Sequence, residues 1–371
     1  MKKGRTELIL DIGSASVGVC VATFTKGQKP LVTHTKRVPI RTDSAEALGG
    51  IQALALEALK KNLENIPHTS KPEVIHVVFA APWYASEIKI VVSESDKVLK
   101  IGRATVTHAI SGQRAQDAKE IRQGRCAVES AVTQIYVNGY PTALHNPVRG
   151  KQLRVHLYES EVDVAFVEAI TEIVRHSVPH VPLRFHTFPF LAFATLRALS
   201  NEENFTFVDV GGEITDVGVV NRGGLNVMQS FPKGARSLAR TIAGTGSLAD
   251  AISRLTLFAR DELSPQESEV FSKLFSTVAT SWNEDYGRIQ ESVLKVTPMP
   301  RKTFLMADGE ALAWFQKVFS ARADMLQAEL TLVTPHFFEE HVTLGEGGEY
   351  DSFLSLEVLF FAMKKEDLVD L

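Results

Sequence analysis

Two segments of the chain repeat one order of apolar and polar positions. Each begins with an apolar run, continues with Asp, one apolar residue and Gly, and ends with a second apolar run: LILDIGSASVGVCVA at 8–22 and FVDVGGEITDVGVV at 207–220. Asp11 pairs with Asp209 and Gly13 with Gly211, 198 positions later. A Gly-containing turn and a third strand-like stretch follow each copy. The pattern predicts a strand, a tight bend, a strand, a turn and a strand, used twice.

Strand-like and helical segments alternate after each copy. Apolar residues at helical spacing between 45 and 66 predict an amphipathic helix, and VIHVVFAAP after it predicts a buried strand. After the second copy, residues 247–293 are helical in composition with a break at Ser264–Pro265, and KTFLMADGEALAWF predicts a strand, a Gly turn and the start of a helix. The alternation predicts an α/β fold with mixed sheets covered by helices.

One stretch, from about residue 86 to about residue 160, has no counterpart in the second half. It contains a polar helix candidate around 114–132 and two alternating runs, TQIYVNGYP and KQLRVHLYES. We expect a small α+β insertion in the first lobe. Surface insertions of this kind commonly carry binding.

Length and composition limit the number of domains and the classes of protein to which the chain can belong. The 371 residues favour two core-bearing units, which we expect at 1–200 and 201–371, the second with a helical subdomain at 247–296. A net charge of −4 argues against a dedicated nucleic-acid binder. The longest apolar run has six residues, too few to cross a bilayer, so we expect a soluble cytoplasmic protein. Two cysteines are too few for a disulfide framework or a Cys-based zinc site.

The Asp-x-Gly bends carry the candidate chemistry. Glycine lets the backbone approach an anion, so that successive N–H groups point at phosphate oxygens. A carboxylate instead suits a hydrated Mg²⁺. Two such bends facing one another would grip a triphosphate from both sides, with Asp11 and Asp209 on the metal and hydroxyls from Ser14 and Thr215. A lone bend of this type is usually only a turn, but two at matching places in a duplicated fold indicate a shared site.

These residues also carry a resemblance to a known family. LDIGSASVGVCVA resembles the first phosphate motif of the actin-like ATPase superfamily, FVDVGGEITDVGVV resembles the second, and FLMADGEALAWF lies where that superfamily has its adenosine loop. The position of the insertion and the segment QSFPKGARSLARTIAG are most similar to the FtsA and PilM type of bacterial actin-like protein.

The resemblance implies a duplicated, ribonuclease H-like two-lobe fold with an SHS2-type insertion in the first lobe. It implies ATP and Mg²⁺ in the interlobe cleft, with Asp11 and Asp209 holding the metal through water. The nucleotide-binding residues would be Gly13, Ser14, Ala15, Gly211, Gly212, Thr215, Lys233, Gly234 and Gly309. For Lys233, a role on the nucleotide and a place facing solvent are equally open.

Three departures from the family pattern bear on function. Glu213 replaces the third Gly of the second motif, and a carboxylate there repels an anionic ligand unless it turns outward or joins the metal shell. Of the adenosine loop, only Gly309 is carried over. Phe188 stands where the family often has an acid or amide, and it cannot orient a water. We therefore expect a slow ATPase at most.

Function and partners follow from the resemblance. The leading interpretation is a nucleotide-binding scaffold that self-associates into dimers or filaments and binds a division or pilus protein through residues 86–160. Two alternatives stay open: an adaptor of the same fold that has lost nucleotide binding, and a small-molecule kinase. The apolar tail before Lys364 and Lys365 favours a helix packed on the fold over a membrane anchor, so membrane contact is expected only through partners, at the inner face of the membrane.

Overall fold

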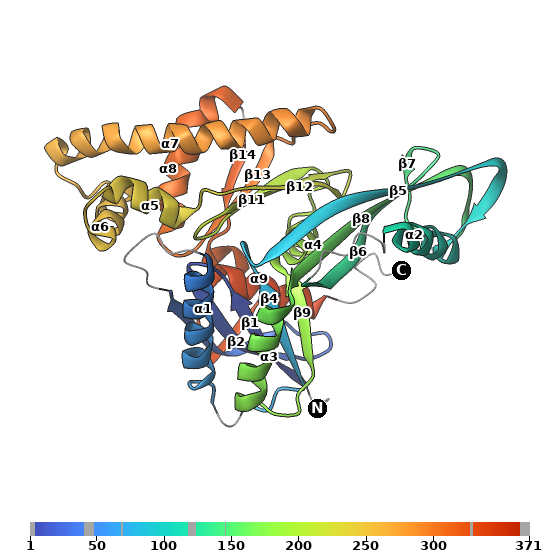
Figure 1. Cartoon of the computed structure of the whole chain (residues 1–371), viewed down its shortest axis with the longest axis horizontal. Helices are drawn as coiled ribbons and strands as arrows, with labels where there is room; N and C mark the ends of the chain where they lie inside the picture. The colour runs from blue at the N-terminus through green and yellow to red at the C-terminus, as the bar shows by residue number, and fades with distance from the viewer. Residues whose placement is uncertain are drawn as a thin grey trace.

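The computed structural model describes residues 4–40, 48–67, 70–117, 124–144, 146–326 and 329–363. They form three sheets (Figure 1). The strands of the first sheet, in spatial order, are β15 (Thr343–Gly347), β3 (Leu31–Pro39), β2 (Ser16–Phe24), β1 (Arg5–Ile12), β4 (Val74–Phe79) and β9 (Leu183–Thr187). Those of the second are β12 (Gly224–Phe231), β11 (Thr215–Asn221), β10 (Phe205–Val210), β13 (Lys302–Ala307) and β14 (Glu329–Leu332).

The two large sheets share one topology. In each, the first strand of the repeat pairs antiparallel with the second, and the second pairs antiparallel with the third. On its other side the first strand pairs parallel with a fourth, which pairs parallel with a fifth. The predicted duplicated α/β fold is confirmed, because both halves repeat this order strand by strand.

Helices cover both faces of each large sheet. They are α1 (Leu48–Leu63), α3 (Val164–Ser177), α4 (Phe188–Ser200), α5 (Ala235–Ala243), α6 (Leu248–Ala259), α7 (Pro265–Leu294), α8 (Ala311–Leu326) and α9 (Ser352–Ala362), with a 3₁₀ turn η1 at Pro335–Phe338. One apolar core joins α1 and α3 to the first sheet, and another joins α5 to α8 to the second. A third core lies between the sheets, where α4 and α9 are buried (Figure 1).

Burial on both faces explains why the repeated strands are almost continuously apolar. In β1, Leu8 and Leu10 face the core with α1 and α3, while Ile9 faces the core with α4 and α9. Successive side chains of a strand point to opposite faces, so Asp11 shares the inner face with Ile9. By the same parity, Asp209 in β10 shares the inner face with Phe207. Both Asp side chains therefore project toward the space between the lobes.

A third sheet is built between β4 and α3. Its strands, in spatial order, are β5 (Tyr84–Ile101), β8 (Val148–Asp163), β6 (Arg125–Val137) and β7 (Tyr140–Pro141), and it carries α2 (Arg103–Asp117). The polar helix predicted at 114–132 is wrong in place: α2 ends at Asp117, and 125–137 is strand β6. Val132, Ile135 and Val137 are buried apolar residues in β6, and pairing with β8 outweighs the local helical pattern.

Of two predictions on the second half of the chain, one is confirmed and one needs correction. The helical region with a break at Ser264–Pro265 is confirmed: α6 begins after Ser247, and α7 begins after Ser264 in a capping box with Glu267. The assignment of all of 201–371 to the second lobe needs correction, because β15 pairs with β3 of the first sheet. Apolar patterning predicts a strand but not the sheet whose edge it joins.

The C-terminal apolar segment is a helix packed on the fold, as predicted. In α9 the side chains of Leu354, Leu356 and Val358 are buried between the two large sheets. Lys364, Lys365 and the acids that follow lie outside the described residues. Within the ranges that the structure describes, no helix combines the length and the apolar character that crossing a bilayer demands.

Candidate interlobe site

The two Asp-x-Gly bends have the same backbone geometry. In the first, between β1 and β2, the Gly13 N–H donates to the Ser16 carbonyl at 3.0 Å. In the second, between β10 and β11, the Gly211 N–H donates to the Ile214 carbonyl at 3.0 Å. Each bend thus closes on itself directly after the strand that ends in Asp-x. The local sequence repeat therefore produces a structural repeat.

The bends face each other and touch. The Glu213 N–H donates to Ser14 Oγ at 3.3 Å, and a Cβ on Gly212 would lie 2.9 Å from the Ala15 nitrogen. The cavity between them measures about 30 Å³ and is lined from both lobes by Asp11, Gly13, Ser14, Ala15, Asp209, Gly211 and Gly212, among others. Pockets that bind small molecules measure roughly 300–1,000 Å³. The described arrangement brings the predicted phosphate loops together but leaves no space for a triphosphate.

Arg37 of β3 occupies the position next to Asp11. Its Nη1 lies 2.8 Å from Asp11 Oδ2, and Asp11 is buried with no hydrogen-bond partner on Oδ1. Burial raises the pKa of Asp11 to about 6, and the charge of Arg37 opposes this shift only in part. The carboxylate that the sequence assigns to Mg²⁺ is therefore paired with a protein cation.

The same guanidinium connects three further groups, which with Asp11 form the Arg37 cluster. It donates from Nε and Nη2 to the Asp351 carboxylate at 2.6 and 2.9 Å, and from Nη1 to Ser16 Oγ at 2.9 Å. Asp308 Oδ1 lies 3.9 Å from Nε, and Ser16 Oγ donates to Asp308 Oδ2 at 2.5 Å. Although burial alone would raise it, the pKa of Asp351 is lowered by Arg37. The cluster joins the first sheet, the end of β13 and the N-cap of α9.

Asp209 has a different environment. It is buried, its Oδ1 has no partner, and no ion pair reaches it in the part of the chain that the structure describes. Burial, with the neighbouring carboxylates of Asp216, Asp11 and Asp308, raises the pKa of Asp209 well above its ordinary value. Burial without a neighbouring cation disfavours the charged form of a carboxyl group. Asp209 is thus the one predicted metal ligand that has no cation of the protein beside it.

Two of the predicted nucleotide-binding side chains point away from the cavity. Thr215 donates its hydroxyl to the Lys233 carbonyl at 2.6 Å and accepts from the indole N–H of Trp282, so it faces the interior of the second lobe. Lys233 Nζ lies 2.5 Å from Asp285 Oδ2 on α7 and 2.8 Å from the Ser281 carbonyl. Both side chains are thus satisfied within the second lobe, and their roles on a nucleotide stay predictions.

Gly234 and Gly309 lie at positions where the backbone conformation or a close backbone contact favours glycine. The N–H groups of Ala235 and Arg236, at the start of α5, donate to the carbonyls of Gly211 and Gly212 at 2.9 Å. The first N–H groups of a helix have no partner within the helix and can bind phosphate. Here they are already hydrogen-bonded to the carbonyls of the second bend. Gly309 has φ of +49°, which suits the turn after β13, and only its neighbour Asp308 lines the cavity.

The departures seen in the sequence have a structural explanation. Glu213 turns outward and pairs with Arg240 through both carboxylate oxygens, one of them 2.9 Å from Nη1. Phe188 is fully buried and lies with its ring 5.2 Å from that of Phe353. The acid beside the phosphate loop is thus neutralised, and the water-orienting position is part of the core.

The sequence did not reveal Arg37, Asp308 or Asp351 as site residues. Arg37 lies in a half-buried strand and carries no local signal. Asp351 does carry one, because it precedes an apolar run as an N-cap does, and its Oδ1 accepts from the N–H groups of Phe353 and Leu354 at 3.0 and 2.9 Å. That signal marks a helix start and says nothing of Arg37.

Taken together, the described residues do not fit Mg·ATP. The metal-binding carboxylate of the first lobe holds Arg37, the amides of α5 hold the second bend, and the cavity is filled by the bends themselves. An anionic ligand would also meet Asp308 and Asp209, both lining the cavity. Among the described residues, no group of three or more His, Cys, Asp or Glu side chains is arranged to hold a metal ion.

Comparison with known proteins supports the architecture. No protein-family model matches the sequence, and no match is found among the curated proteins. Among solved structures, the chain is similar to PilM in the PilM–PilN type IV pilus biogenesis complex, with a TM-score of 0.66 and 16% identity over 96% of this chain and 97% of that one. At this level of identity, the similarity shows the fold alone.

Two further solved structures give lower scores. The ethanolamine utilization protein EutJ from Carboxydothermus hydrogenoformans has a TM-score of 0.45 and 13% identity, covering 88% of this chain and 84% of its own. MreB 5 of Spiroplasma citri, bound to AMPPNP, has a TM-score of 0.42 and 11% identity, covering 88% and 91%. The similarity to PilM and the duplicated sheets with their facing bends lead to one conclusion: the chain adopts the two-lobed fold of the actin-like ATPases.

Proposed function

We propose that this protein is an actin-like adaptor, a two-lobed scaffold that works through protein partners and holds its cleft closed with its own side chains. The observation that carries the proposal is the pairing of Arg37 with Asp11 at 2.8 Å. A guanidinium in that place supplies the positive charge that a metal would otherwise bring to the carboxylate. The contact between Gly212 and the Ser14–Ala15 bend supports the same interpretation.

The proposed partner is a component of a pilus or division assembly. PilM, the relative with the TM-score of 0.66, is a member of a complex with PilN in type IV pilus biogenesis. By analogy we assign a partner site to the third sheet with α2, which includes the predicted module 86–160, and self-association into dimers or filaments to the two lobes. The proposal puts the protein in the cytoplasm, at the inner face of the membrane.

A second candidate function is the nucleotide-binding scaffold that the sequence favours. One observation supports it: Asp11 Oδ1 and Asp209 Oδ1 are both buried without a partner at the same cavity. Buried polar atoms are seldom left unpaired, and two carboxylate oxygens without donors suit a cation. This function requires that the bends separate and that Arg37 releases Asp11.

Titration with Mg·ATP separates the two functions. We expect no heat of binding in calorimetry and no change in melting temperature, for the wild type and for Asp209→Ala alike. A real site would add about 2.7 kcal/mol to the free energy of unfolding at a hundred-fold excess of ligand over Kd. Binding by the wild type that is lost in Asp209→Ala would overturn the adaptor and establish the nucleotide-binding scaffold.

A third protein, Arg37→Ala, sharpens the comparison. If Arg37 alone keeps Mg²⁺ from Asp11, its removal allows Mg²⁺-dependent heat to appear where the wild type gives none. The matched control is Arg240→Ala, which removes a guanidinium that pairs with Glu213 outside the cavity. Heat of binding in both variants would mean that the lobes loosen in general, and not that Arg37 keeps Mg²⁺ from Asp11.

A further inference from the structure

The part of the third sheet within residues 89–154, away from the acidic residues at its base near the lobes, differs in charge from the rest of the chain. Residues 89–154 contain eleven Lys and Arg against five Asp and Glu, whereas the remaining residues contain 29 against 39. A basic segment on an otherwise acidic protein creates a field that favours an anionic partner on one side only. The sheet projects away from the two lobes (Figure 1), so this charge is presented at a distance from the acidic body.

The end of the sheet that lies farthest from the lobes is formed by three segments, which we call the distal end: residues 95–103, 138–140 and 147–151. Between Glu94 and Leu99 the pairing of β5 with β8 is interrupted, so the residues between them bulge out of the sheet. A Cβ on Gly150 would lie 3.1 Å from Ile101 and 3.3 Å from Asn138, and the Lys151 N–H donates to Asn138 Oδ1 at 2.9 Å. The three segments are therefore in contact and form one surface.

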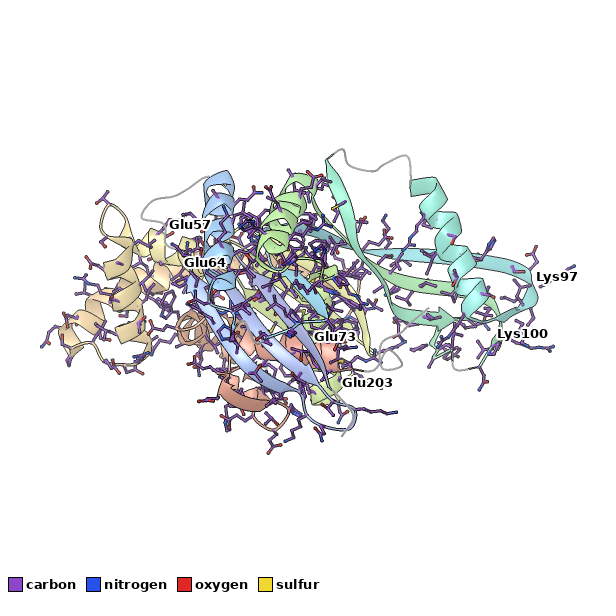
Figure 2. All side chains as sticks on the ribbon, turned by 90° about the horizontal axis from the view of Figure 1, so that it is seen from below. Glu57, Glu64, Glu73, Lys97, Lys100 and Glu203 are labelled. Atoms are coloured by element: carbon purple, nitrogen blue, oxygen red, sulfur yellow. The ribbon has the colours of Figure 1, made fainter. Side chains whose placement is uncertain are left out.

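Exposed basic and apolar side chains alternate on the distal end. The basic ones are Lys97, Lys100, Arg103, Arg149 and Lys151. None of these five takes part in an ion pair within the described ranges of the chain. The apolar ones are Val98, Leu99 and Tyr140, which are 58%, 45% and 75% exposed. Figure 2 shows Lys97 and Lys100 at the tip of the sheet, far from Glu57, Glu64, Glu73 and Glu203 on the body.

We propose that the distal end docks on the surface of an anionic membrane. Lys and Arg near such a surface are attracted to its acidic headgroups, and Tyr and short apolar side chains suit the boundary between headgroups and hydrocarbon. The distal end projects from the lobes and presents both kinds of side chain at one tip, from the ends of β5, β7 and β8 and the start of α2, so that they can meet a flat surface together. An acidic protein surface would pair with the lysines, but it offers no apolar surface for Val98, Leu99 and Tyr140 to contact.

This contact goes beyond the proposed adaptor function and does not depend on it. The sequence predicts membrane association only through partners. A docked distal end instead gives the protein its own weak, salt-sensitive membrane contact, which would hold the lobes at a fixed side of the bilayer. Because the contact lies on the third sheet, it is independent of nucleotide and of the Arg37 cluster.

Vesicle flotation tests the proposal on the full chain. We expect binding to vesicles of phosphatidylcholine with phosphatidylglycerol, no binding to phosphatidylcholine alone, and release at high salt. The triple variant Lys97→Glu, Lys100→Glu and Lys151→Glu should bind roughly a hundred-fold more weakly, since each basic residue contributes about five-fold. The double variant Val98→Asn and Leu99→Asn should bind more weakly at every salt concentration.

The control is a triple variant with the same change of charge elsewhere. Lys26, Lys29 and Lys295 are exposed on the two lobes, and their replacement by Glu should leave binding within about three-fold of the wild type. Equal losses in both triple variants, or binding to neutral vesicles, would overturn the proposal. Absence of vesicle binding together with capture of a poly-glutamate peptide would assign the distal end to an acidic polypeptide instead.

Discussion

At the scale of single residues, the guanidinium of Arg37 determines the charge balance of the cleft. Arg37 forms ion pairs with Asp11 and Asp351, and its side chain is mostly buried. Charges taken out of water depend on their partners, because a buried charge that loses its counter-charge keeps the full cost of desolvation. The electrostatics of the site therefore rest on this residue more than on the glycines.

The first prediction concerns the removal of that cation. Arg37→Met should lower the free energy of unfolding by about 3–5 kcal/mol, because it leaves Asp11 and Asp351 buried without a counter-charge. Arg37→Lys should restore only part of the loss, since an ammonium cannot make the two-point contact with Asp351. Urea unfolding measures both, with Lys273→Met, from an exposed pair with Glu269, as the control. Equal effects in Arg37→Met and the control would refute the role of Arg37.

The second prediction concerns pH. Burial raises the pKa of Asp216 to about 6, although Tyr84 and Ser230 donate hydrogen bonds to its carboxylate. A folded-state pKa above the unfolded value means that the folded state binds the proton more tightly, so stability is highest below pH 4 for this group and falls as pH rises to about 6. The whole shift corresponds to about 3 kcal/mol at most.

Asp216→Asn should therefore flatten the fall in stability between pH 4 and pH 6. Chemical unfolding of the wild type and the variant at four pH values in this window measures the difference. Asp96→Asn, an exposed change on β5, provides the control for charge alone. Parallel pH profiles for the wild type and Asp216→Asn would show that Asp216 does not titrate in this window.

At the scale of elements, the contact between α5 and the second bend shapes the site. The helix begins directly against Gly211 and Gly212, and its first amides are used within the protein. This approach is possible because residue 234 has no side chain. A Cβ there would lie 2.3 Å from the Gly211 carbonyl oxygen and 2.5 Å from that of Gly212.

The third prediction follows from that contact. Gly234→Ala should destabilise the protein by about 1–3 kcal/mol, because backbone atoms must move to admit the methyl group. Gly112→Ala is the matched control: Gly112 lies in α2, a Cβ there meets nothing within 4 Å, and the change should stabilise by about 0.5–1 kcal/mol. Thermal unfolding of the two variants should move in opposite directions. A shift in the same direction for both would argue against the close contact.

At the scale of the whole molecule, polar contacts across the cleft join the lobes. Ser16 donates to Asp308 at 2.5 Å, and Arg236 donates to the Ala15 carbonyl at 3.1 Å. Tyr84, at the start of β5, donates to Asp216 in β11. Together with α4 and α9 between the sheets, these contacts favour one closed arrangement.

The fourth prediction is that fewer cross-lobe contacts open the cleft without unfolding either lobe. Asp308→Ala combined with Arg236→Met should increase the radius of gyration in small-angle scattering and should speed hydrogen exchange at residues 211–213. The control is Glu310→Ala with Arg260→Met, which breaks a 3.0 Å pair that lies entirely within the second lobe. An unchanged radius of gyration in the first variant would mean that apolar packing alone keeps the lobes together.

Apolar patterning predicts most of the fold. Strands such as 8–12 and 207–210 must be buried on both faces, because they are apolar at nearly every position, and the Asp-x-Gly steps must form tight bends between antiparallel strands. These are local properties, so the repeated strands, the two bends and the helices around Ser264 follow from short stretches of chain. The helix misplaced at 114–132 marks the limit, since β6 owes its conformation to pairing with β8.

Which charged groups come into contact depends instead on how distant parts of the chain pack. Arg37, Asp308 and Asp351 are far apart in the chain. The pairing of β3 with β2, the closure of the two lobes and the return of the last segment to the first sheet bring them to Asp11 in turn. The orientation of Thr215 and Lys233 likewise depends on α7, whose contacting residues lie 67 and 48 positions away in the chain. Because the free energy of a charge depends on its burial and on its neighbours, the chemistry of the cleft is a property of packing and not of the motifs.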